Sequence, residues 1–431
     1  MNKYRVPYGK TEIEFTLPPG MSGTLAVSKS LPPVRDMSAA VKKALETPVN
    51  SPRVKELAKA GDKVCIVFTD ITRASPDHLL VPPLLAELES TGVRDKDITL
   101  LCGVGMHRPS TPEEKVVKLG KAVVDRYRVV DNEPQNPSML VDLGKTESGI
   151  PLSVNKIAYE ADLLMATGIV EPHQYAGYSG GPKTLAVGAA GEAMIAYTHG
   201  PQMIDHPGTR LGRIEGNPFH EAITEAARRA RLRFVINVIM DEEKQVLAVR
   251  AGEPEATLEE LVKIARTIYE VPVPKQYDVA IGGVGFPKDA NLYQASRAPT
   301  YLFFAPTPVV RPGGVFIIPA RCEEGVGQGV GEKRFLDEMK RAKDIPTLLA
   351  DLRRTGYPPG AQRAFVLAKV LEHNEVIVVG SQHPTVVQEA KMTPAADMNE
   401  ALRIAAAKLG PNLNVLVVPH ALLTLPIVQS T

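Results

Sequence analysis

Eight short apolar runs, each followed by a polar loop and usually by a helical pattern, constrain the fold of this chain more than any other feature. Their unbroken hydrophobic character is typical of strands that helices cover on both faces, as in a parallel sheet. The runs span residues 64–69, 98–102, 163–170, 234–240, 279–282, 315–319, 376–379 and 415–418. The repeated order of strand, loop and helix predicts an α/β protein.

Two local patterns fix where further elements begin and end. Residues 3–17 alternate apolar and polar side chains around Gly9 and Lys10, which predicts a hairpin. A capping box at Thr111, with Pro112 at the first helical position, predicts a helix that ends at Gly120.

The length of the chain predicts more than one domain, since 431 residues exceed the size at which a single core keeps growing. The sequence VPVP at 271–274 separates a long charged helix pattern from a new strand, which favours a boundary near residue 270. We expect an N-terminal α/β domain over residues 1–270 and a C-terminal α/β domain over residues 271–418. Residues 419–431 are expected to pack back on the N-terminal domain.

Charge and composition limit the class of partner. Fifty basic and 49 acidic residues give a net charge of +1, so neither a nucleic acid nor an anionic membrane is expected as a partner. The charged start of the chain has no apolar signal segment, and no run approaches the roughly 18 apolar residues of a membrane span. Three scattered cysteines do not suggest a disulfide framework. These features predict a cytoplasmic protein.

Four loops carry charged and polar side chains beside small residues. In an open α/β sheet, ligands bind outside the carboxyl ends of the strands, so loops that follow strands are where chemistry is expected. The four loops are DITR at 70–73, GVGMHR at 103–108, EPHQYAGYSGGPKT at 171–184 and NLYQASR at 291–297. They hold the candidate site residues of this chain.

The sequence SGGPK at 179–183 predicts a tight turn that feeds a helix beginning at Pro182. Free N–H groups and the positive end of the helix dipole would then face one point, where we expect an anion such as a phosphate. Residues 177–184 have the length of a P-loop, but Pro182 stands at the second glycine and removes one N–H donor. We see no acidic strand end for Mg²⁺, so a kinase or NTPase is a less favoured alternative.

Lys183 has two interpretations from its position alone. The positive potential of a first helical turn should lower the pKa of its amine and enlarge the neutral, nucleophilic fraction. A lysine beside a phosphate is usually an ionic partner, so its position favours a phosphate clamp over covalent attachment and leaves both open.

His107 and His173 lie on different strand-end loops, where two imidazoles could face opposite sides of one substrate. An imidazole takes up and releases a proton near neutral pH, as the reversible inversion of a stereocentre requires. The alternative is two loop histidines with satisfied hydrogen bonds. Arg73 and Arg297 offer forks for a carboxylate, although isolated arginines are usually solvated. His199 is a candidate metal ligand, but the histidine spacing does not form a known zinc pattern.

In four tracts the chain resembles the nickel-pincer-nucleotide-dependent lactate racemase family. These tracts are GMHR at 105–108, the run from EPH at 171–173 to Lys183, YTH at 197–199 and NLYQ at 291–294. The likeness spans nearly the whole chain. It implies two Rossmann-like α/β domains, the N-terminal one binding the cofactor, with the active site in the cleft between them.

The resemblance also implies a cofactor and its attachment. Lys183 would carry a pyridinium-3-thioamide-5-thiocarboxylic acid mononucleotide that holds Ni²⁺, and His199 would be the metal ligand from the protein. The phosphate would lie in the turn of Ser179, Gly180 and Gly181. Loading such a group would require cofactor-biosynthesis enzymes as partners.

The activity implied is the racemisation or epimerisation of a small 2-hydroxy acid. In the family mechanism, a histidine removes the hydroxyl proton while the C2 hydride moves to the nucleotide, and His107 and His173 match the two bases. The remaining matches are the cofactor-supporting residues Asp70 and Tyr293 and the substrate-binding residues Arg73, Gln174, Gln294 and Arg297.

The chain departs from the lactate racemase pattern at two positions that bear on the substrate. Arg297 stands where a lysine is expected, and Gln174 stands where an aromatic residue is expected. A second arginine fork and a polar neighbour suit an additional carboxylate or several hydroxyls, so a malate-like acid or a sugar acid is a rival to lactate. A further alternative is a family member that binds a 2-hydroxy acid or a nickel nucleotide without racemising a substrate.

Overall fold

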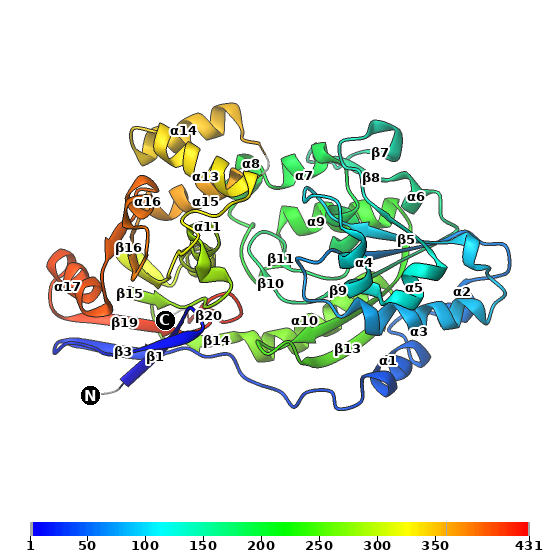
Figure 1. The fold of residues 1–431 in the computed structure, drawn as a ribbon, viewed down its shortest axis with the longest axis horizontal. Coiled ribbons are helices and arrows are strands. Elements are labelled where there is room, and N and C mark those ends of the chain that lie inside the picture. Colours follow the sequence, from blue (N-terminus) through cyan, green and yellow to red (C-terminus); the bar gives the residue numbers. More distant parts are fainter. Residues whose placement is uncertain (1–2, 359, 430–431) are drawn as a thin grey trace. The chain divides into compact units, whose positions relative to one another are not determined.

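The computed structural model describes residues 3–358 and 360–429, which divide into two compact units (Figure 1). The N-terminal unit contains residues 30–199 and 214–268. The C-terminal unit contains the chain up to residue 29, residues 200–213 and the chain from residue 269 onward. Each unit has its own six-stranded sheet, and each is described separately below.

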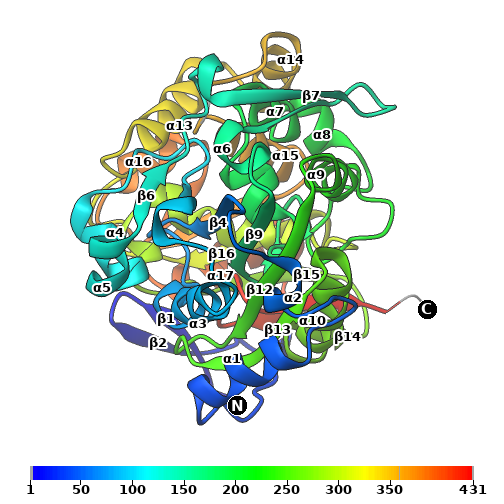
Figure 2. The same cartoon turned by 90° about the vertical axis from the view of Figure 1, so that its right-hand side faces the viewer.

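The N-terminal unit is built on a sheet with the strand order β13-β12-β9-β4-β5-β6. All neighbours are parallel except β12 and β13. Figure 2 shows β4, β9, β12 and β13 of this sheet. The strands are β4 (Val64–Thr69), β5 (Ile98–Gly103), β6 (Arg128–Asp131), β9 (Leu163–Ile169), β12 (Leu232–Met240) and β13 (Val246–Gly252).

Helices cover both faces of this sheet, because alternate residues of the central strands point to opposite sides. Ile66 and Phe68 pack in one core with α1 (Met37–Glu46), α3 (Asp77–Glu89) and α4 (Pro112–Leu119). Cys65 and Val67 pack in a second core with α6 (Lys156–Tyr159), the π-helix η3 (Thr184–Gly188) and α9 (Pro218–Arg229). The unbroken apolar character of β4 follows from this double burial.

The remaining elements of the N-terminal unit are short or peripheral. They are α2 (Val54–Leu57), η1 (Asp95–Asp97), α5 (Lys121–Arg126), η2 (Pro137–Met139), β7 (Leu140–Lys145), β8 (Pro151–Asn155), β10 (Pro172–His173), β11 (Gly177–Tyr178), α7 (Glu192–Thr198) and α10 (Pro254–Tyr269).

The strand order of this sheet reverses at β4. From β4 the chain proceeds on one side to β5 and β6, and it later adds β9 and β12 on the other side. The loops that follow β4 and β9 therefore flank the topological switch point, where open α/β sheets bind their ligands.

Two glycines bring the end of β5 against η3. A Cβ on Gly188 would lie 3.0 Å from the Cα of Gly103, so only glycine at these positions allows the observed approach of the two backbones. The N–H of Gly105 donates to the carbonyl of Gly188 at 2.8 Å. The loop after β5 is thereby held against the segment that follows Lys183.

The C-terminal unit has an all-parallel sheet with the strand order β18-β17-β16-β15-β19-β3. One core joins this sheet to α17 (Met398–Leu409) and to the hairpin of β1 (Lys3–Tyr8) and β2 (Thr11–Thr16). The strands are β3 (Met21–Leu25), β15 (Tyr277–Gly282), β16 (Val310–Pro319), β17 (Glu375–Val379), β18 (Thr393–Ala395) and β19 (Leu413–Val418).

Further elements complete the C-terminal unit. They are α8 (Pro201–Asp205), β14 (Glu270–Val273), η4 (Lys288–Ala290), α11 (Leu292–Ala295), α12 (Arg297–Phe303), α13 (Val330–Arg341), α14 (Ile345–Thr355), α15 (Gln362–Leu371), α16 (Pro384–Glu389) and β20 (Leu425–Val428). None of the helices among the described residues is long and apolar enough to cross a membrane.

The predicted α/β class is confirmed, and all eight apolar runs are strands. The hairpin around Gly9 and the helix that begins at Pro112 are also present. The compact units differ from the predicted domains of residues 1–270 and 271–418, because β3 joins the C-terminal sheet beside β19. In the tail, β20 pairs with β14, and both strands belong to the C-terminal unit.

Candidate active site

Ten of the predicted site residues lie in the N-terminal unit, on loops that follow neighbouring parallel strands or at the end of the helix beyond them. Asp70 and Arg73 follow β4, His107 follows β5, and His173 and Lys183 follow β9. His199 directly follows α7. Because the carboxyl ends of parallel strands share one edge of the sheet, these side chains gather at the switch point.

Asp70 and His107 are joined by a hydrogen bond of 2.6 Å between Oδ2 and Nδ1. The carboxylate is buried, while the imidazole is half exposed. Burial would raise the pKa of Asp70, but hydrogen bonds from His107 and Thr72 and the charge of Arg73 outweigh it and hold that pKa below its ordinary value. An ionised carboxylate only accepts, so the proton of neutral His107 lies on Nδ1 and its Nε2 can accept a proton.

The hydrogen bonds of His173 select the opposite tautomer from that of His107. The Nδ1 of His173 accepts the backbone N–H groups of Tyr175 at 3.3 Å and of Ala176 at 3.2 Å. An accepting Nδ1 carries no proton, so the neutral imidazole carries its proton on Nε2. The ring also contacts the rings of Tyr175 and Phe219. The two histidines therefore present different groups: His107 an acceptor, His173 a donor.

His199 has the protonation state that a metal ligand requires. Its Nδ1 lies 3.0 Å from the carbonyl oxygen of Ile195, which can only accept, so Nδ1 carries the proton and Nε2 the lone pair. Burial and the charges of Lys183 and Arg73 lower the pKa of His199 to about 4. A neutral imidazole with an oriented ring is the form that binds nickel or zinc.

Lys183 is a buried amine, only 8% exposed. Burial and then the positive charge of Arg73 lower its pKa to about 7, against smaller opposing effects of Glu171 and Asp70. A large fraction of this amine is neutral and nucleophilic at physiological pH. The pKa of Lys183 is lowered as the sequence predicted, and burial is the largest cause.

The helix after the turn is shorter than predicted. Lys183 caps a single π turn that runs from Thr184 to Gly188, and the N–H of Ala186 donates to the carbonyl of Pro182 at 2.9 Å. Pro182 stands at the start of this segment, where the first N–H groups of a helix have no partner within the helix, so the missing N–H of proline removes no helical bond.

Several donors of this turn bond within the protein. The hydroxyl of Ser179 donates to the carbonyl of Ile169 at 2.7 Å, and the N–H of Gly181 donates to the side chain of Asn237 at 2.6 Å. The N–H of Lys183 donates to the carbonyl of Gly180 at 3.1 Å. These groups make the turn a support for Lys183, and a role for Ser179, Gly180 and Gly181 in binding phosphate stays a prediction.

Gly180 shows why this support needs a glycine. Its φ of +85° lies in the left-handed region, and a Cβ there would lie 2.6 Å from Val170 and 3.0 Å from the side chain of Asn237. The sequence signal at this position was the glycine pair, and its physical basis is the close packing of the turn on the end of β9 and on Asn237 of β12.

Three predicted residues belong to the C-terminal unit: Tyr293 and Gln294 on α11 and Arg297 at the start of α12. The guanidinium of Arg297 donates to the Tyr301 hydroxyl at 2.6 Å and lies 5.1 Å from the centre of its ring. Tyr293 contacts the ring of Phe335 and lies under the guanidinium of Arg363. Gln174 is buried in the N-terminal unit, beside His173.

Sequence reasoning missed three polar residues at the switch point. Lys118 on α4 and Asp77 at the start of α3 form a buried ion pair of 2.7 Å. Asn237, at 0% exposure on β12, accepts from the turn before Lys183. Asn237 interrupts an otherwise apolar strand, which is a signal that the sequence offered. Lys118 had no such signal, because in the sequence it looks like one more charged residue on the polar face of an ordinary amphipathic helix.

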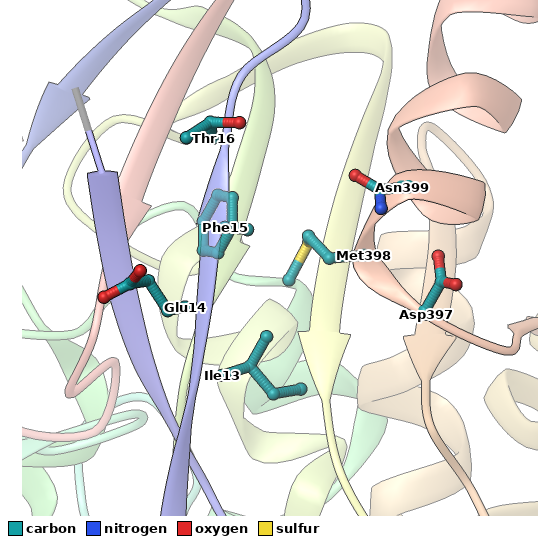
Figure 3. Close-up of a pocket in the computed structure, with 7 residues that line it drawn as sticks. All are labelled: Ile13, Glu14, Phe15, Thr16, Asp397, Met398 and Asn399. Carbon is teal, nitrogen blue, oxygen red and sulfur yellow. The ribbon is translucent and has the colours of Figure 1, made fainter. Parts of the chain in front are cut away.

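Neither a cluster of metal-binding side chains nor a hollow in the C-terminal unit offers a second site among the described residues. Within residues 3–358 and 360–429, no group of three or more His, Cys, Asp or Glu side chains could hold a metal ion. A hollow of about 330 Å³ in the C-terminal unit is lined by β2 and the start of α17 (Figure 3). It holds none of the predicted site residues, and Asp397 in it already caps α17.

Comparisons with known proteins agree along the whole chain. Residues 8–212 match the family described as the lactate racemase N-terminal domain, and residues 274–425 match the lactate racemase C-terminal domain. A lactate racemase of Thermoanaerobacterium thermosaccharolyticum is 32% identical over 422 residues, covering 97% of this chain and 98% of the relative. A lactate racemase of Lactiplantibacillus plantarum is 33% identical over 384 residues, covering 89% of each chain.

Solved structures give the same picture of the fold. The lactate racemase apoprotein of T. thermosaccharolyticum superposes with a TM-score of 0.89 at 31% identity, over 99% of this chain and 100% of that one. A structural-genomics protein of Thermotoga maritima superposes with a TM-score of 0.66 at 19% identity, over 91% and 97% of the two chains. The second likeness concerns the fold alone.

The lowered pKa of Lys183 predicts its reactivity. In the protein without any bound group, trace acylation of Lys183 should rise with a midpoint near pH 7, whereas an unperturbed lysine titrates near pH 10.4. Arg73→Gln should move the midpoint to higher pH, because it removes a positive charge that favours the neutral amine. Peptide mass spectrometry at a series of pH values from about 5 to about 11 measures the extent of Lys183 acylation in the wild-type protein and in Arg73→Gln.

The matched control is Arg108→Gln, which removes an exposed arginine that pairs with Glu114 in the neighbouring loop. This variant should leave the Lys183 midpoint in place. A midpoint near pH 10 in the unmodified protein would contradict the assignment of a neutral Lys183.

Proposed function

Because the chain belongs to the lactate racemase family, we propose that it racemises or epimerises a small 2-hydroxy acid, using a nickel-pincer nucleotide attached to Lys183. The observation that carries the proposal is a buried amine with a pKa of about 7 beside the Asp70–His107 pair, on a chain of this family. The amine would form the covalent link, and the pair would handle the hydroxyl proton.

The residues around Lys183 fit such a group. A neutral lysine amine can form the thioamide link that a protonated one cannot. A neutral His199, with its ring oriented through Nδ1, offers Nε2 as the one protein ligand to nickel. A nucleotide that supplied its own sulfur and carbon donors to nickel would need only this one ligand from the protein. Imidazole is a suitable ligand for nickel.

When bound, the nucleotide would supply the acceptor for the hydrogen that leaves C2 with its electron pair and would return it to either face of the resulting 2-keto acid. The protein's part is then to move one proton. His107 would take the hydroxyl proton at Nε2, and the imidazolium so formed would be stabilised by its hydrogen bond to Asp70. Arg73 would bind the substrate carboxylate through its guanidinium fork.

His173 would serve the opposite stereoisomer from a different starting state. In its resting tautomer Nε2 carries the proton. In this state it would donate a hydrogen bond to a substrate oxygen. To take a proton itself, the imidazole must leave the two backbone donors that now hold Nδ1. We infer that His107 acts directly as a base and that His173 acts only after its ring or its loop moves.

The experiment that tests the function is an intact-mass measurement with peptide mapping. Protein co-expressed with the cofactor-biosynthesis enzymes should carry a nucleotide-sized adduct on Lys183 together with nickel, and Lys183→Arg should carry neither. The loaded protein should invert lactate, malate or a sugar acid in a chiral assay. An unmodified mass, in a host that loads a known family member, would contradict the proposal.

The same measurement separates the alternatives. A loaded protein that binds 2-hydroxy acids tightly but inverts none would be a binding member of the family. A kinase or NTPase would instead hydrolyse nucleotides with Mg²⁺, and Lys183→Ala would abolish that activity. The internal hydrogen bonds of the turn at residues 179–183 favour neither of these alternatives over the racemase.

The two histidines give a second test. His107→Ala and His173→Ala should each lower kcat of the loaded enzyme at least about 10²-fold, since each removes a group that transfers a proton. Initial rates in both directions, from each pure stereoisomer, measure the loss and its asymmetry.

The control for these variants is His206→Ala in the C-terminal unit. His206 also accepts a backbone N–H on Nδ1, from Gly208 at 3.0 Å, but it is not among the proposed catalytic residues. This variant should keep kcat within about twofold, as most substitutions away from a site do. A histidine variant at position 107 or 173 with near-normal turnover would remove that residue from the mechanism.

The substrate depends on Arg297, for which we propose a role in binding a second carboxylate or hydroxyls. Its hydrogen bond to Tyr301 orients the guanidinium, and an oriented fork binds a carboxylate in two places where an ammonium binds in one. Arg297→Lys should therefore lower kcat/KM for malate relative to lactate by roughly tenfold, the effect of about 1.4 kcal/mol.

Arg311→Lys is the control for this substitution, because Arg311 pairs with Asp278 elsewhere in the C-terminal unit. It should leave the ratio of malate to lactate turnover unchanged. An unchanged ratio in Arg297→Lys itself would show that Arg297 does not select a polar substrate.

A further inference from the structure

An ion pair of Asp77 and Lys118 lies buried next to the candidate active site. Nζ of Lys118 is 2.7 Å from Oδ2 of Asp77, and the two side chains are 6% and 0% exposed. Asp77 is the first residue of α3 and Lys118 lies near the end of α4. Neither residue belongs to the tracts that identified the family.

Every polar atom of Asp77 is bonded. Oδ2 accepts from the hydroxyl of Thr69 at 2.8 Å, and Oδ1 accepts from the hydroxyls of Ser75 at 3.0 Å and Thr167 at 2.5 Å. Thr69 ends β4, Thr167 lies in β9, and Ser75 lies in the loop after β4. The carboxylate thus ties the two strands of the switch point to the loop between β4 and α3.

Lys118 ties the same loop from the other side. Besides Asp77, its Nζ donates to the Thr69 hydroxyl at 2.9 Å, to the Ser75 carbonyl at 2.8 Å and to the Arg73 carbonyl at 3.3 Å. One lysine therefore donates hydrogen bonds to two backbone carbonyls of residues 70–75. Arg73 and Asp70, at the outer part of this loop, face the candidate site.

The position of the pair in the chain shows what it connects. The loop after β4 carries Asp70 and leads into α3, which begins at Asp77. The loop after β5 carries His107 and leads into α4, which carries Lys118. The two connections are therefore joined twice: by Asp70 and His107 at the site, and by Asp77 and Lys118 beneath it.

Stability alone does not account for this pair. Removing two charges from water costs about as much as their attraction returns, so a buried ion pair contributes little net stability compared with apolar residues of similar size. Its effect is to select one arrangement of the groups that satisfy it. Here those groups are the ends of two strands and the loop that carries Asp70.

We propose that Asp77 and Lys118 are positioning residues, which hold residues 70–75 so that Asp70 meets Nδ1 of His107. The consequence for catalysis rests on the proposed function, whereas the geometric claim does not. Without the pair, the loop would relax, the bond between Asp70 and His107 would lengthen, and the Nε2 lone pair of His107 would lose its fixed direction.

The test is the double variant Asp77→Asn with Lys118→Met. Removing both charges avoids leaving one of them buried and unpaired, which would be strongly destabilising. The matched control is Asp131→Asn with Lys115→Met, because Lys115 lies on the same helix and forms an ion pair of 2.8 Å with Asp131 at the end of β6. The control removes a half-buried pair that does not bond to residues 70–75.

The first readout is nuclear magnetic resonance of the protein without a bound group, labelled with ¹⁵N-histidine. The Nδ1 proton of His107, assigned by its loss in His107→Gln, should give a distinct signal while it bonds to Asp70. The Asp77/Lys118 variant should lose this signal to exchange with water, and the Asp131/Lys115 variant should keep it. An unchanged signal in the folded Asp77/Lys118 variant would overturn the proposal.

The second readout is a double-mutant cycle on the loaded enzyme. The Asp77/Lys118 variant should lower kcat by about tenfold or more in the wild-type background, since small misplacements of a catalytic group cost up to about 10²-fold. In the His107→Ala background the Asp77/Lys118 variant should lower kcat by less than about threefold, because the imidazole that the pair positions is already absent. Equal losses in both backgrounds would show that the pair does not act through His107.

A milder variant keeps the proposal testable if the double variant does not fold. Ser75→Ala removes one hydroxyl from Asp77 and leaves both charges and the Ser75 carbonyl in place. Ser75→Ala should speed the exchange of the His107 Nδ1 proton with water, whereas the Asp131/Lys115 control variant should not. An unaltered exchange rate in Ser75→Ala would count against the proposal. A loaded wild-type protein that racemises no 2-hydroxy acid would refute the proposed function. The magnetic-resonance result would still show whether the ion pair holds Asp70 against Nδ1 of His107.

Discussion

The alignment of three parallel strands, β9, β4 and β5, is the constraint on which the candidate site depends. Their register brings the carboxyl ends of the strands to one edge of the sheet, so that loops separated by up to a hundred residues meet there. The contact of Gly103 with Gly188 then presses the loop after β5 against the segment that follows Lys183. Without either feature, His107 and Lys183 would belong to separate parts of the surface.

The sequence predicted the sheets well because their strands are buried on both faces, which leaves a continuous apolar signal. It failed where that signal is absent. The strand β3, with the sequence MSGTL, is short and lies at a sheet edge, so nothing in its pattern indicated that it joins the C-terminal unit. The domain ranges were displaced for the same reason, since a boundary drawn from a proline-rich segment cannot detect a chain that returns to an earlier unit.

The site was predictable to the extent that its residues follow strands. Asp70, His107 and Lys183 were found in this way, and the structure adds hydrogen bonds that spacing could not supply. The pair of Asp77 and Lys118 was out of reach, because each residue taken alone is an ordinary helix-start acid and an ordinary surface lysine in the sequence. The π form of the turn after Lys183 was also unpredictable, since hydrophobic spacing does not distinguish it from the first turn of an α-helix.

Burial is the largest cause of the lowered pKa values of Lys183 and His199, and the charge of Arg73 adds to it at both. The same charge favours the ionised form of Asp70, which holds the proton of His107 on Nδ1. One guanidinium thus favours the neutral forms of Lys183 and His199 and the ionised form of Asp70. An arginine keeps its charge across the physiological pH range, so its effect on these three groups stays constant, whereas a group that titrates with its neighbours would lose it.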